Sequence, residues 1–286
     1  MLESYDEKTI ESVDGITIAY RVNNIAGSKQ FELFHPPSSM NRTSLEALEI
    51  LYNGAGKSSI NFDPRGTGKS DKPDSYHSYD KELYVEDVKA IIKAEGIEQF
   101  SFVAYDAGFM TAVEYAVANE GVTHIHGLTP PYAFKESTKF PLIAEFMDNS
   151  LVRILGESFG RGMGQIQTLF SKKLSLYPEF NEYVNKSDFS LFLAMMNVPL
   201  DEQRAHILSG RNMFRWNIVD ALQKNTTPLS LVYGSNDIAV VPEVGDCINE
   251  LSVGPVRIAV LEGGSHSFPV TKPRETFNQK LDPSLY

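Results

Sequence analysis

The sequence predicts an α/β fold, in which a mostly parallel eight-stranded sheet is flanked by helices and carries an inserted helical lid. Short β-prone segments alternate with helical stretches, as βαβ units on a parallel sheet require. The alternation stops in residues 135–224, which have a helical pattern and are rich in Phe, Met, Leu and Tyr. We therefore expect residues 1–134 and 225–286 to form the core of the fold. Residues 135–224 are expected to form a helical cap inserted into that core.

The positions of glycine and proline, together with the hydrophobic pattern, predict where each strand begins and ends. The eight expected strands span residues 7–13, 15–22, 30–35, 58–62, 99–105, 123–129, 228–233 and 256–261. The first two are expected to form an antiparallel hairpin that turns at Asp14 and Gly15. A helical stretch at 82–95 connects two later strands, which places those strands in parallel.

Length and composition describe a globular chain that can bury a substantial core. The chain has 286 residues, of which 42% are hydrophobic, and this suits one large domain with an insertion. It carries 26 basic and 37 acidic residues, for a formal net charge of −11. Such a charge repels nucleic acid and anionic membrane surfaces. We therefore expect a small-molecule substrate as the partner, with no nucleic acid and no membrane, while the oligomeric state stays open.

Neither a disulfide nor a cofactor is expected. Cys247 is the only cysteine of the sequence, and no apolar run approaches membrane-spanning length. Together with a polar, acidic start, these two features favour a cytoplasmic protein.

Two segments resemble a phosphate-binding loop, Gly54–Ser58 and Gly66–Ser70, but each lacks the first glycine of that motif. His124 and His126 alternate on an expected strand without an acidic partner, so they are interpreted as structural residues and not as metal ligands.

The segment 100–112 (FSFVAYDAGFMTA) carries the most informative residue of the chain. In it a β-prone apolar run ends at Asp106, and a helical pattern follows. Small residues surround Asp106, namely Ala104, Ala107 and Gly108. They allow a strained backbone where a strand and a helix approach closely. This layout predicts a nucleophile elbow with an aspartate where a serine is usual.

Two further polar residues follow later strands of the predicted sheet. Asp237 comes just after an apolar strand and the turn residue Gly234, and His266 follows the next strand after two glycines. The loops after the carboxyl ends of parallel strands share one edge of a sheet. We therefore expect Asp106, Asp237 and His266 to converge on one active site.

With the segment 63–73 (DPRGTGKSDKP), the elbow and the two polar turns, the chain resembles the α/β-hydrolase superfamily over nearly its whole length. This resemblance implies the roles of nucleophile for Asp106, acid for Asp237 and base for His266. An aspartate nucleophile is typical of the epoxide hydrolase and dehalogenase branches of that superfamily. These branches are the nearest match in mechanism.

The aspartate determines which chemistry is plausible. Its attack on an ester would give a reactive mixed anhydride, whereas displacement at a saturated carbon gives an alkyl ester that activated water can cleave. His266 would activate that water, while Asp237 fixes the tautomer of the imidazole. The sequence thus predicts a cofactor-independent hydrolase that acts on a small, mostly apolar substrate through a covalent alkyl-enzyme, by epoxide- or halide-type displacement.

The loop that should complete the oxyanion hole departs from the family pattern. The branches with an aspartate nucleophile usually carry His-Gly-x-Pro there, but this chain has His35 followed by Pro36 and Pro37. Pro37 has no N–H at the expected donor position. Ser38 or Ser39 could substitute by amide or hydroxyl. His35 and Ser38 are accordingly included among the oxyanion and substrate-binding candidates, with His35 expected to brace its loop.

Other candidates for substrate contact follow from the elbow and from the expected lid. The amide of Ala107 remains available as an oxyanion donor, but dehalogenases usually place a halide-binding tryptophan at this position, so a haloalkane is disfavoured. Tyr105 directly precedes the nucleophile and is counted with the substrate-binding residues. Epoxide opening needs an acid on the leaving oxygen, and Tyr132, Tyr177 and Tyr183 are candidates.

Two alternative functions remain compatible with the sequence. Asp106 could act as a base without forming a bond to the substrate, in an esterase or a carbon–carbon bond hydrolase. The chain could also be a non-catalytic ligand-binding protein of the same fold, which would explain both Pro37 and the aspartate at the elbow.

Overall fold

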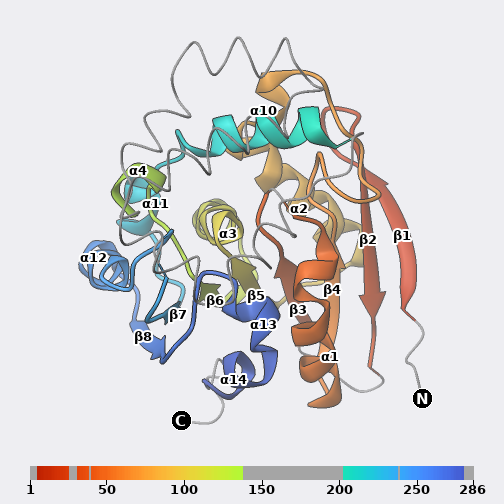
Figure 1. The fold of residues 1–286 in the computed structure, drawn as a ribbon. Helices are drawn as coiled ribbons and strands as arrows, with labels where there is room; N and C mark the ends of the chain where they lie inside the picture. Colours follow the sequence, from red (N-terminus) through yellow and green to blue (C-terminus); the bar gives the residue numbers. More distant parts are fainter. Residues whose placement is uncertain (1–4, 26–30, 39, 138–201, 238, 280–286) are drawn as a thin grey trace.

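The computed structural model describes residues 5–25, 31–38, 40–137, 202–237 and 239–279. Its centre is one eight-stranded sheet in the order β1-β2-β4-β3-β5-β6-β7-β8 (Figure 1). The strands are β1 (Asp6–Glu11), β2 (Thr17–Asn23), β3 (Phe31–His35), β4 (Ser58–Phe62), β5 (Phe100–Tyr105), β6 (Val122–Leu128), β7 (Leu229–Gly234) and β8 (Val256–Leu261). The predicted number of strands is confirmed.

The sheet is mostly parallel, as predicted. The pairs β1–β2 and β2–β4 are antiparallel, and all other neighbours are parallel. The first hairpin turns at Gly15, whose φ of 80° is in the region that favours glycine. The amide of Ser12 donates to the carbonyl of Ile16 at 2.8 Å and closes that turn.

Helices cover both faces of the sheet. They are α1 (Glu46–Gly54), α2 (Lys81–Glu95), α3 (Ala107–Ala118), α4 (Phe134–Ser137), α10 (Gln203–Met213), α11 (Val219–Leu222), α12 (Val244–Leu251), α13 (Phe268–Thr271) and α14 (Pro273–Asn278), with short 3₁₀ turns η1 (Arg42–Leu45) and η2 (Tyr76–Tyr79). Within the described ranges, no helix combines the length and the apolar character that crossing a membrane requires.

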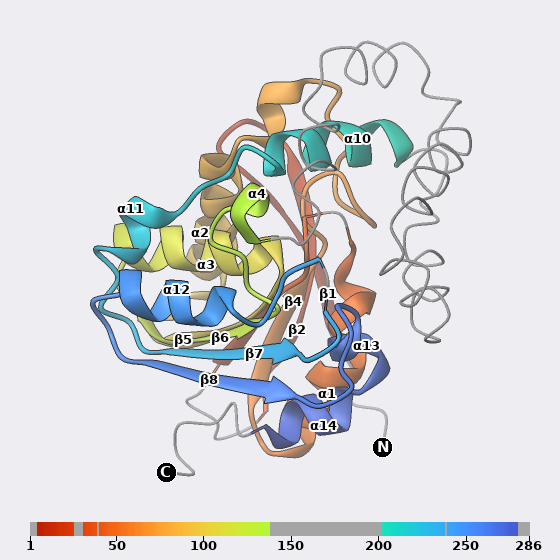
Figure 2. The same ribbon diagram turned by 60° about the vertical axis from the view of Figure 1, so that its left-hand side comes forward.

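The core has two parts, one on each face of the sheet, and Figure 2 shows the helices that cover the two faces. The larger part packs α2, α3, α11 and α12 against the sheet, and the smaller part packs α1 and α13 against the other face. Neighbouring residues of β5 alternate between them, since Phe102 belongs to the larger part and Val103 to the smaller. Because both faces are covered, the central strands are apolar along most of their length.

The expected helical cap, residues 135–224, lies mostly outside the described residues, because 138–201 are not described. Tyr177 and Tyr183 belong to that stretch. In the described remainder, α10 packs against η2. The hydroxyl of Ser209 in α10 donates to the carbonyl of Ser38 at 3.1 Å, and this hydrogen bond connects α10 to the loop after β3. The boundaries of core and cap stay a prediction.

Candidate active site

Asp106 occupies a strained turn between β5 and α3. Its φ is 51° and its ψ is −122°, a conformation that costs a non-glycine residue about 1–3 kcal/mol. Two backbone bonds hold it: the Asp106 amide donates to the carbonyl of Leu128 at 2.9 Å, and the Phe109 amide donates to the carbonyl of Asp106 at 2.9 Å. A Cβ on Gly108 would stand 2.6 Å from the carbonyl oxygen of His35. Glycine is therefore required for α3 to start this close to the loop after β3.

The turns after β7 and β8 are packed directly against each other. A Cβ on Gly234 would lie 2.3 Å from the carbonyl oxygen of Gly264, so this contact also depends on a glycine. The Asn236 amide donates to the carbonyl of Gly264 at 2.8 Å, and the Ser235 amide donates to the carbonyl of Leu261 at 3.0 Å. These bonds fix the positions from which Asp237 and His266 project.

Asp237 and His266 form a hydrogen-bonded pair at this edge. His266 Nδ1 lies 2.9 Å from Asp237 Oδ2, while Asp237 Oδ1 accepts from the amides of Ala239 and Val240 at 2.9 and 3.0 Å. The Asp237 carboxylate is thus fully engaged. It orients the imidazole so that Nε2 is the ring atom that can exchange protons with a substrate or water.

The Asp106 carboxylate has a different environment. Asp106 is buried, and its Oδ1 has no hydrogen-bond partner among the described residues. Burial raises the pKa of Asp106 to about 6, against the opposing effects of the His266 charge and the backbone amide of Ala107. The side chain is therefore mostly ionised at neutral pH and keeps one oxygen unengaged, as a nucleophile or a base requires.

His266 lies within the field of both aspartates. Burial alone would lower its pKa, but the charges of Asp237 and Asp106 and the bond to Asp237 raise the pKa of His266 to about 9. At neutral pH the imidazole is therefore protonated. The Tyr105 hydroxyl donates to the carbonyl oxygen of His266 at 2.9 Å, so Tyr105 braces the loop that carries His266.

The loop after β3 lies beside the elbow. His35 is fully buried, its Nδ1 donates to the carbonyl of Pro36 at 2.7 Å, and its Nε2 has no partner among the described residues. Burial lowers the pKa of His35 to about 4, despite that hydrogen bond, so the ring is neutral and braces the loop. The Ser38 hydroxyl donates to Met213 Sδ of α10 at 3.0 Å. Ser39 lies outside the described residues.

The Tyr132 carbonyl accepts a hydrogen bond from the Ile218 amide at 3.0 Å, and the Tyr132 hydroxyl interacts with the Cys247 side chain of α12. His124 Nε2 lies 2.8 Å from Ser230 Oγ, and the buried ring of His126 packs on His124 at 4.4 Å. In the ranges that the structure covers, no group of three or more His, Cys, Asp or Glu side chains is placed to hold a metal ion.

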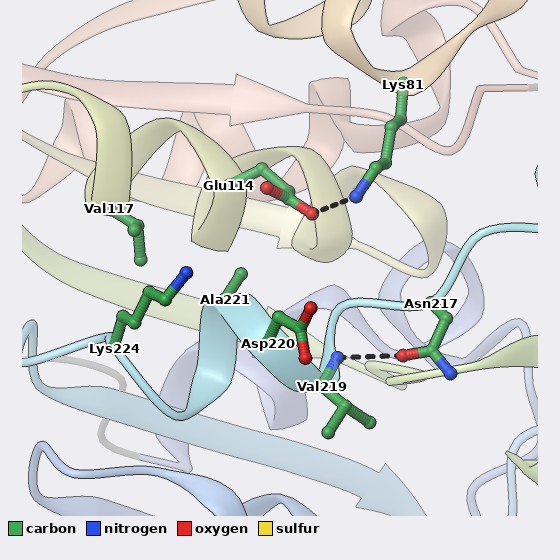
Figure 3. A pocket seen from close by; sticks show the side chains of 8 residues that line it. All are labelled: Lys81, Glu114, Val117, Asn217, Val219, Asp220, Ala221 and Lys224. Carbon is green, nitrogen blue, oxygen red and sulfur yellow. Dashed lines mark hydrogen bonds and ion pairs between the residues drawn. The ribbon is translucent and has the colours of Figure 1, made fainter.

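A surface pocket of about 640 Å³ lies near α3 and α11 (Figure 3). It is lined by Lys81, Glu114, Val117, Asn217, Val219, Asp220, Ala221 and Lys224. Its α3 residues belong to the second half of the helix, whereas Asp106 precedes the first turn. None of the three triad candidates lines it, so this pocket is not the active site.

Sequence reasoning missed one residue at the sheet edge that carries Asp106. Thr129 follows β6, has a φ of 46°, and is fully buried with a hydroxyl that has no partner among the described residues. A signal was present in the sequence, because Pro130 and Pro131 follow directly and end the strand. The positive φ of a β-branched residue, however, cannot be read from the sequence.

The parallel sheet, the strand-to-helix turn and the Asp–His pair at one edge are the architecture of a hydrolase of the α/β class. The chain belongs to the alpha/beta hydrolase fold family, whose model matches residues 39–273. The search of curated proteins gave no match.

Solved structures resemble this chain along nearly its full length. An esterase from Exiguobacterium antarcticum is 18% identical with a TM-score of 0.70, covering 96% of this chain and 98% of its own. The enol-lactonase from Burkholderia xenovorans LB400 is 14% identical with a TM-score of 0.74, at the same coverage of 96% and 98%. A bromoperoxidase from Bacillus anthracis is 18% identical with a TM-score of 0.68, again covering 96% and 98%. At these identities the likeness shows the fold alone.

Proposed function

We propose that this hydrolase displaces a leaving group from a saturated carbon of a small, mostly apolar substrate, with Asp106 as nucleophile, His266 as base and Asp237 as its partner. The observation that carries the proposal is the buried Asp106 carboxylate, which keeps one oxygen unengaged on the elbow. At the same edge, Asp237 orients His266 at 2.9 Å. No cofactor takes part in the proposed reaction.

The reaction has two steps. In the first, a carboxylate oxygen of Asp106 forms a bond to the substrate carbon while the carbon–oxygen bond of an epoxide, or a carbon–halogen bond, breaks. An alkoxide formed in this way takes up a proton, and the imidazolium of His266 can supply it. In the second step His266 removes a proton from water, and hydroxide attacks the carbonyl carbon of the alkyl ester. The bond from that carbon to the alkyl oxygen then breaks, the departing oxygen takes up the remaining proton of the water to leave as an alcohol, and Asp106 is released as a carboxylate.

The electrostatics of the site suit this order of events. The charge of Asp106 is one cause of the raised pKa of His266. Alkylation of Asp106 removes that charge, so the pKa of His266 falls when the imidazole has to act as a base. The imidazole thus changes from acid to base as the covalent intermediate forms.

The scarcity of backbone donors beside the elbow favours displacement at carbon over acyl transfer. The loops after β3 and β6 continue with Pro36-Pro37 and Pro130-Pro131, and none of these four residues has an N–H. A tetrahedral oxyanion needs preorganised donors, and one missing donor costs about a hundredfold or more in rate. Formation of an alkyl-enzyme avoids such an oxyanion, whereas both steps of acyl transfer require one. The hydrolysis of the alkyl-enzyme still passes through one oxyanion, for which the Ala107 amide is the donor beside Asp106.

The proposal is tested by measuring the intact mass of the His266→Gln protein after incubation with styrene oxide, 2-chloropropionate or p-nitrophenyl acetate. We expect an adduct, mapped by peptide to Asp106, because the second step has lost its base. The matched control is His77→Gln, which changes an exposed histidine and should accumulate no adduct.

Other outcomes would contradict the proposal and name its replacement. Turnover of the ester by the wild type without any adduct on Asp106 would indicate that the carboxylate acts as a base. Thermal stabilisation by these compounds without turnover, unaffected by His266→Gln, would indicate a ligand-binding protein.

A further inference from the structure

Thr129 stands beside Asp106 at the carboxyl edge of the sheet. Tyr105 of β5 and Leu128 of β6 are register partners, so the residues that follow them, Asp106 and Thr129, are neighbours across the two strands. The Asp106 amide donates to the carbonyl of Leu128 at 2.9 Å, and the Thr129 amide donates to the carbonyl of Val232 in β7 at 2.8 Å. Thr129 thus lies between the strand of the nucleophile and the strand of the acid.

Thr129 shares the unusual backbone of the nucleophile. Among the described residues, Asp106 and Thr129 are the non-glycine residues with positive φ, at 51° and 46°. A β-branched side chain is strongly disfavoured in this region, where glycine or asparagine fits without difficulty. Strain held by the surrounding structure concentrates at functional sites.

The hydroxyl of Thr129 adds a second unfavourable feature. The side chain has no exposed surface, and its Oγ1 has no hydrogen-bond partner among the described residues. A buried hydroxyl normally has a partner, because an unmade hydrogen bond is costly. Valine has nearly the same shape and would remove this cost. Thr129 therefore combines a strained backbone with an unused donor at the same position.

Donors are scarce at this edge of the sheet. The loops on both sides of the elbow continue with Pro36-Pro37 and Pro130-Pro131, which have no N–H. The Ala107 amide already faces the carboxylate of Asp106. A polar atom of a substrate bound against Asp106 thus has few backbone partners, and the Thr129 hydroxyl can supply a hydrogen bond.

We propose that Thr129 is a substrate-binding residue whose hydroxyl donates a hydrogen bond to the electronegative atom of the substrate, the ring oxygen of an epoxide or the hydroxyl of the diol product. The inference rests on the proposed function, since it places that atom at the carbon that Asp106 attacks. It also accounts for a threonine in a position that is otherwise unfavourable for it.

The test compares Thr129→Val and Thr129→Ser in the His266→Gln background, with styrene oxide as the probe and the rate of adduct formation on Asp106 as the readout. Losing one neutral hydrogen bond should reduce the rate constant at low styrene oxide by about three- to tenfold in the valine variant. The serine variant should retain the rate. The matched control is Thr111→Val in α3, which removes another buried unpartnered hydroxyl and should leave the rate unchanged.

The thermal midpoint separates substrate binding from a structural role. Thr129→Val should be as stable as the wild type or more stable, because an unpaired buried hydroxyl is removed. Equal adduct rates for the valine and threonine proteins would overturn the inference. A valine variant that loses stability and rate together, without rescue by serine, would overturn it too.

A binding measurement keeps this inference separate from the proposed function. If no adduct forms even with Thr129 intact, the covalent mechanism fails, and the affinity for 1-phenyl-1,2-ethanediol is measured by calorimetry instead. A Kd that rises about three- to tenfold in Thr129→Val but not in Thr129→Ser would support the inference. Equal Kd values, or no binding by any of the proteins, would overturn it.

Discussion

Two groups of buried charges in this molecule are built in opposite ways. In the first, the fully buried guanidinium of Arg65 donates to Asp87 Oδ2 at 2.8 Å, to Asp14 Oδ2 at 2.8 Å and to the carbonyl of Ser78 at 2.7 Å. In the second, at the carboxyl edge of the sheet, Asp106 Oδ1 has no partner among the described residues.

The charge of Arg65 is fully compensated within the fold, whereas that of Asp106 is not. Desolvation of Arg65 is offset by two carboxylates and by backbone carbonyls, the arrangement that a buried ion needs to be tolerated. The desolvation of Asp106 is offset only in part, by the Ala107 amide and the charge of His266, and the pKa of Asp106 is raised to about 6 as a result. An incompletely satisfied carboxylate is less stable in the protein and more reactive toward a substrate.

The largest effect is expected for Asp106→Asn. Turnover should fall about 10⁴-fold or more, since the nucleophile is lost. The free energy of unfolding at pH 7 should rise by about 3 kcal/mol, because a buried charge whose pKa is raised from 3.8 to about 6 is removed. Steady-state kinetics and urea unfolding measure the two quantities. A variant that is less stable than the wild type would show that the Asp106 charge is well satisfied, and the contrast with Arg65 would be lost.

Arg65→Met should have the opposite effects, a loss of stability without a loss of activity. Removing the guanidinium leaves Asp87 buried without a counter-charge, which should lower the free energy of unfolding by about 3–5 kcal/mol. The activity per folded molecule should stay unchanged, since the hydrogen bonds of Arg65 go to Asp87, Asp14 and the carbonyls of Ser78 and Leu83. Urea unfolding and active-site titration distinguish the two effects.

The double variant Arg65→Met with Asp87→Leu sharpens this prediction, because it removes both buried charges. It should recover much of the lost stability. If it recovers none, the hydrogen bonds of Arg65 to backbone carbonyls, and not its charge balance, stabilise this region.

The smallest effect is expected from pH. The folded-state pKa of His266 is raised from 6.5 to about 9, and that of Asp106 from 3.8 to about 6. Both groups bind protons more tightly in the folded state than in the unfolded state. Their contribution to the free energy of unfolding is therefore complete below the pKa of the unfolded state, and it is lost as pH rises through the pKa of the folded state. Stability should fall by about 2 kcal/mol between pH 6.5 and 9 through His266.

Urea unfolding at pH 6.5 and 9 measures this slope, which should flatten in His266→Gln and persist in His77→Gln. A slope that is the same in all three proteins would show that the imidazole is not held as a cation. Asp106 adds a loss of stability at lower pH, between pH 3.8 and about 6, and Asp106→Asn should remove that loss.

Most of the fold could be predicted from the sequence. The strand predicted at 58–62 is observed at Ser58–Phe62, and the strand predicted at 7–13 is observed at Asp6–Glu11. Strand interiors are well predicted because alternating or continuous apolar residues must face a core. Strand ends differ by a residue or two, because turns and neighbouring strands decide where pairing stops.

The site could be predicted in its residue types but not in its energetics. Asp237 and His266 are 29 positions apart in the chain and meet at 2.9 Å, as expected for loops at one edge of a parallel sheet. Thr129 was not predicted, because its strain and its unpartnered hydroxyl arise from the packing of β6 between β5 and β7. The roles of the candidates in the proposed reaction stay predictions.

The sequence by itself determined the order of strands and helices, and it placed an aspartate, an acid and a histidine after three strands of one sheet. Only the tertiary structure decided that Asp106 has a pKa of about 6, that His266 has one of about 9, and that Thr129 retains an unpaired hydroxyl. The physical reason is that the two kinds of property depend on different lengths of the chain. Hydrophobic periodicity is a local property of the chain, whereas charge and hydrogen-bond satisfaction depend on burial and on partners that the fold brings together.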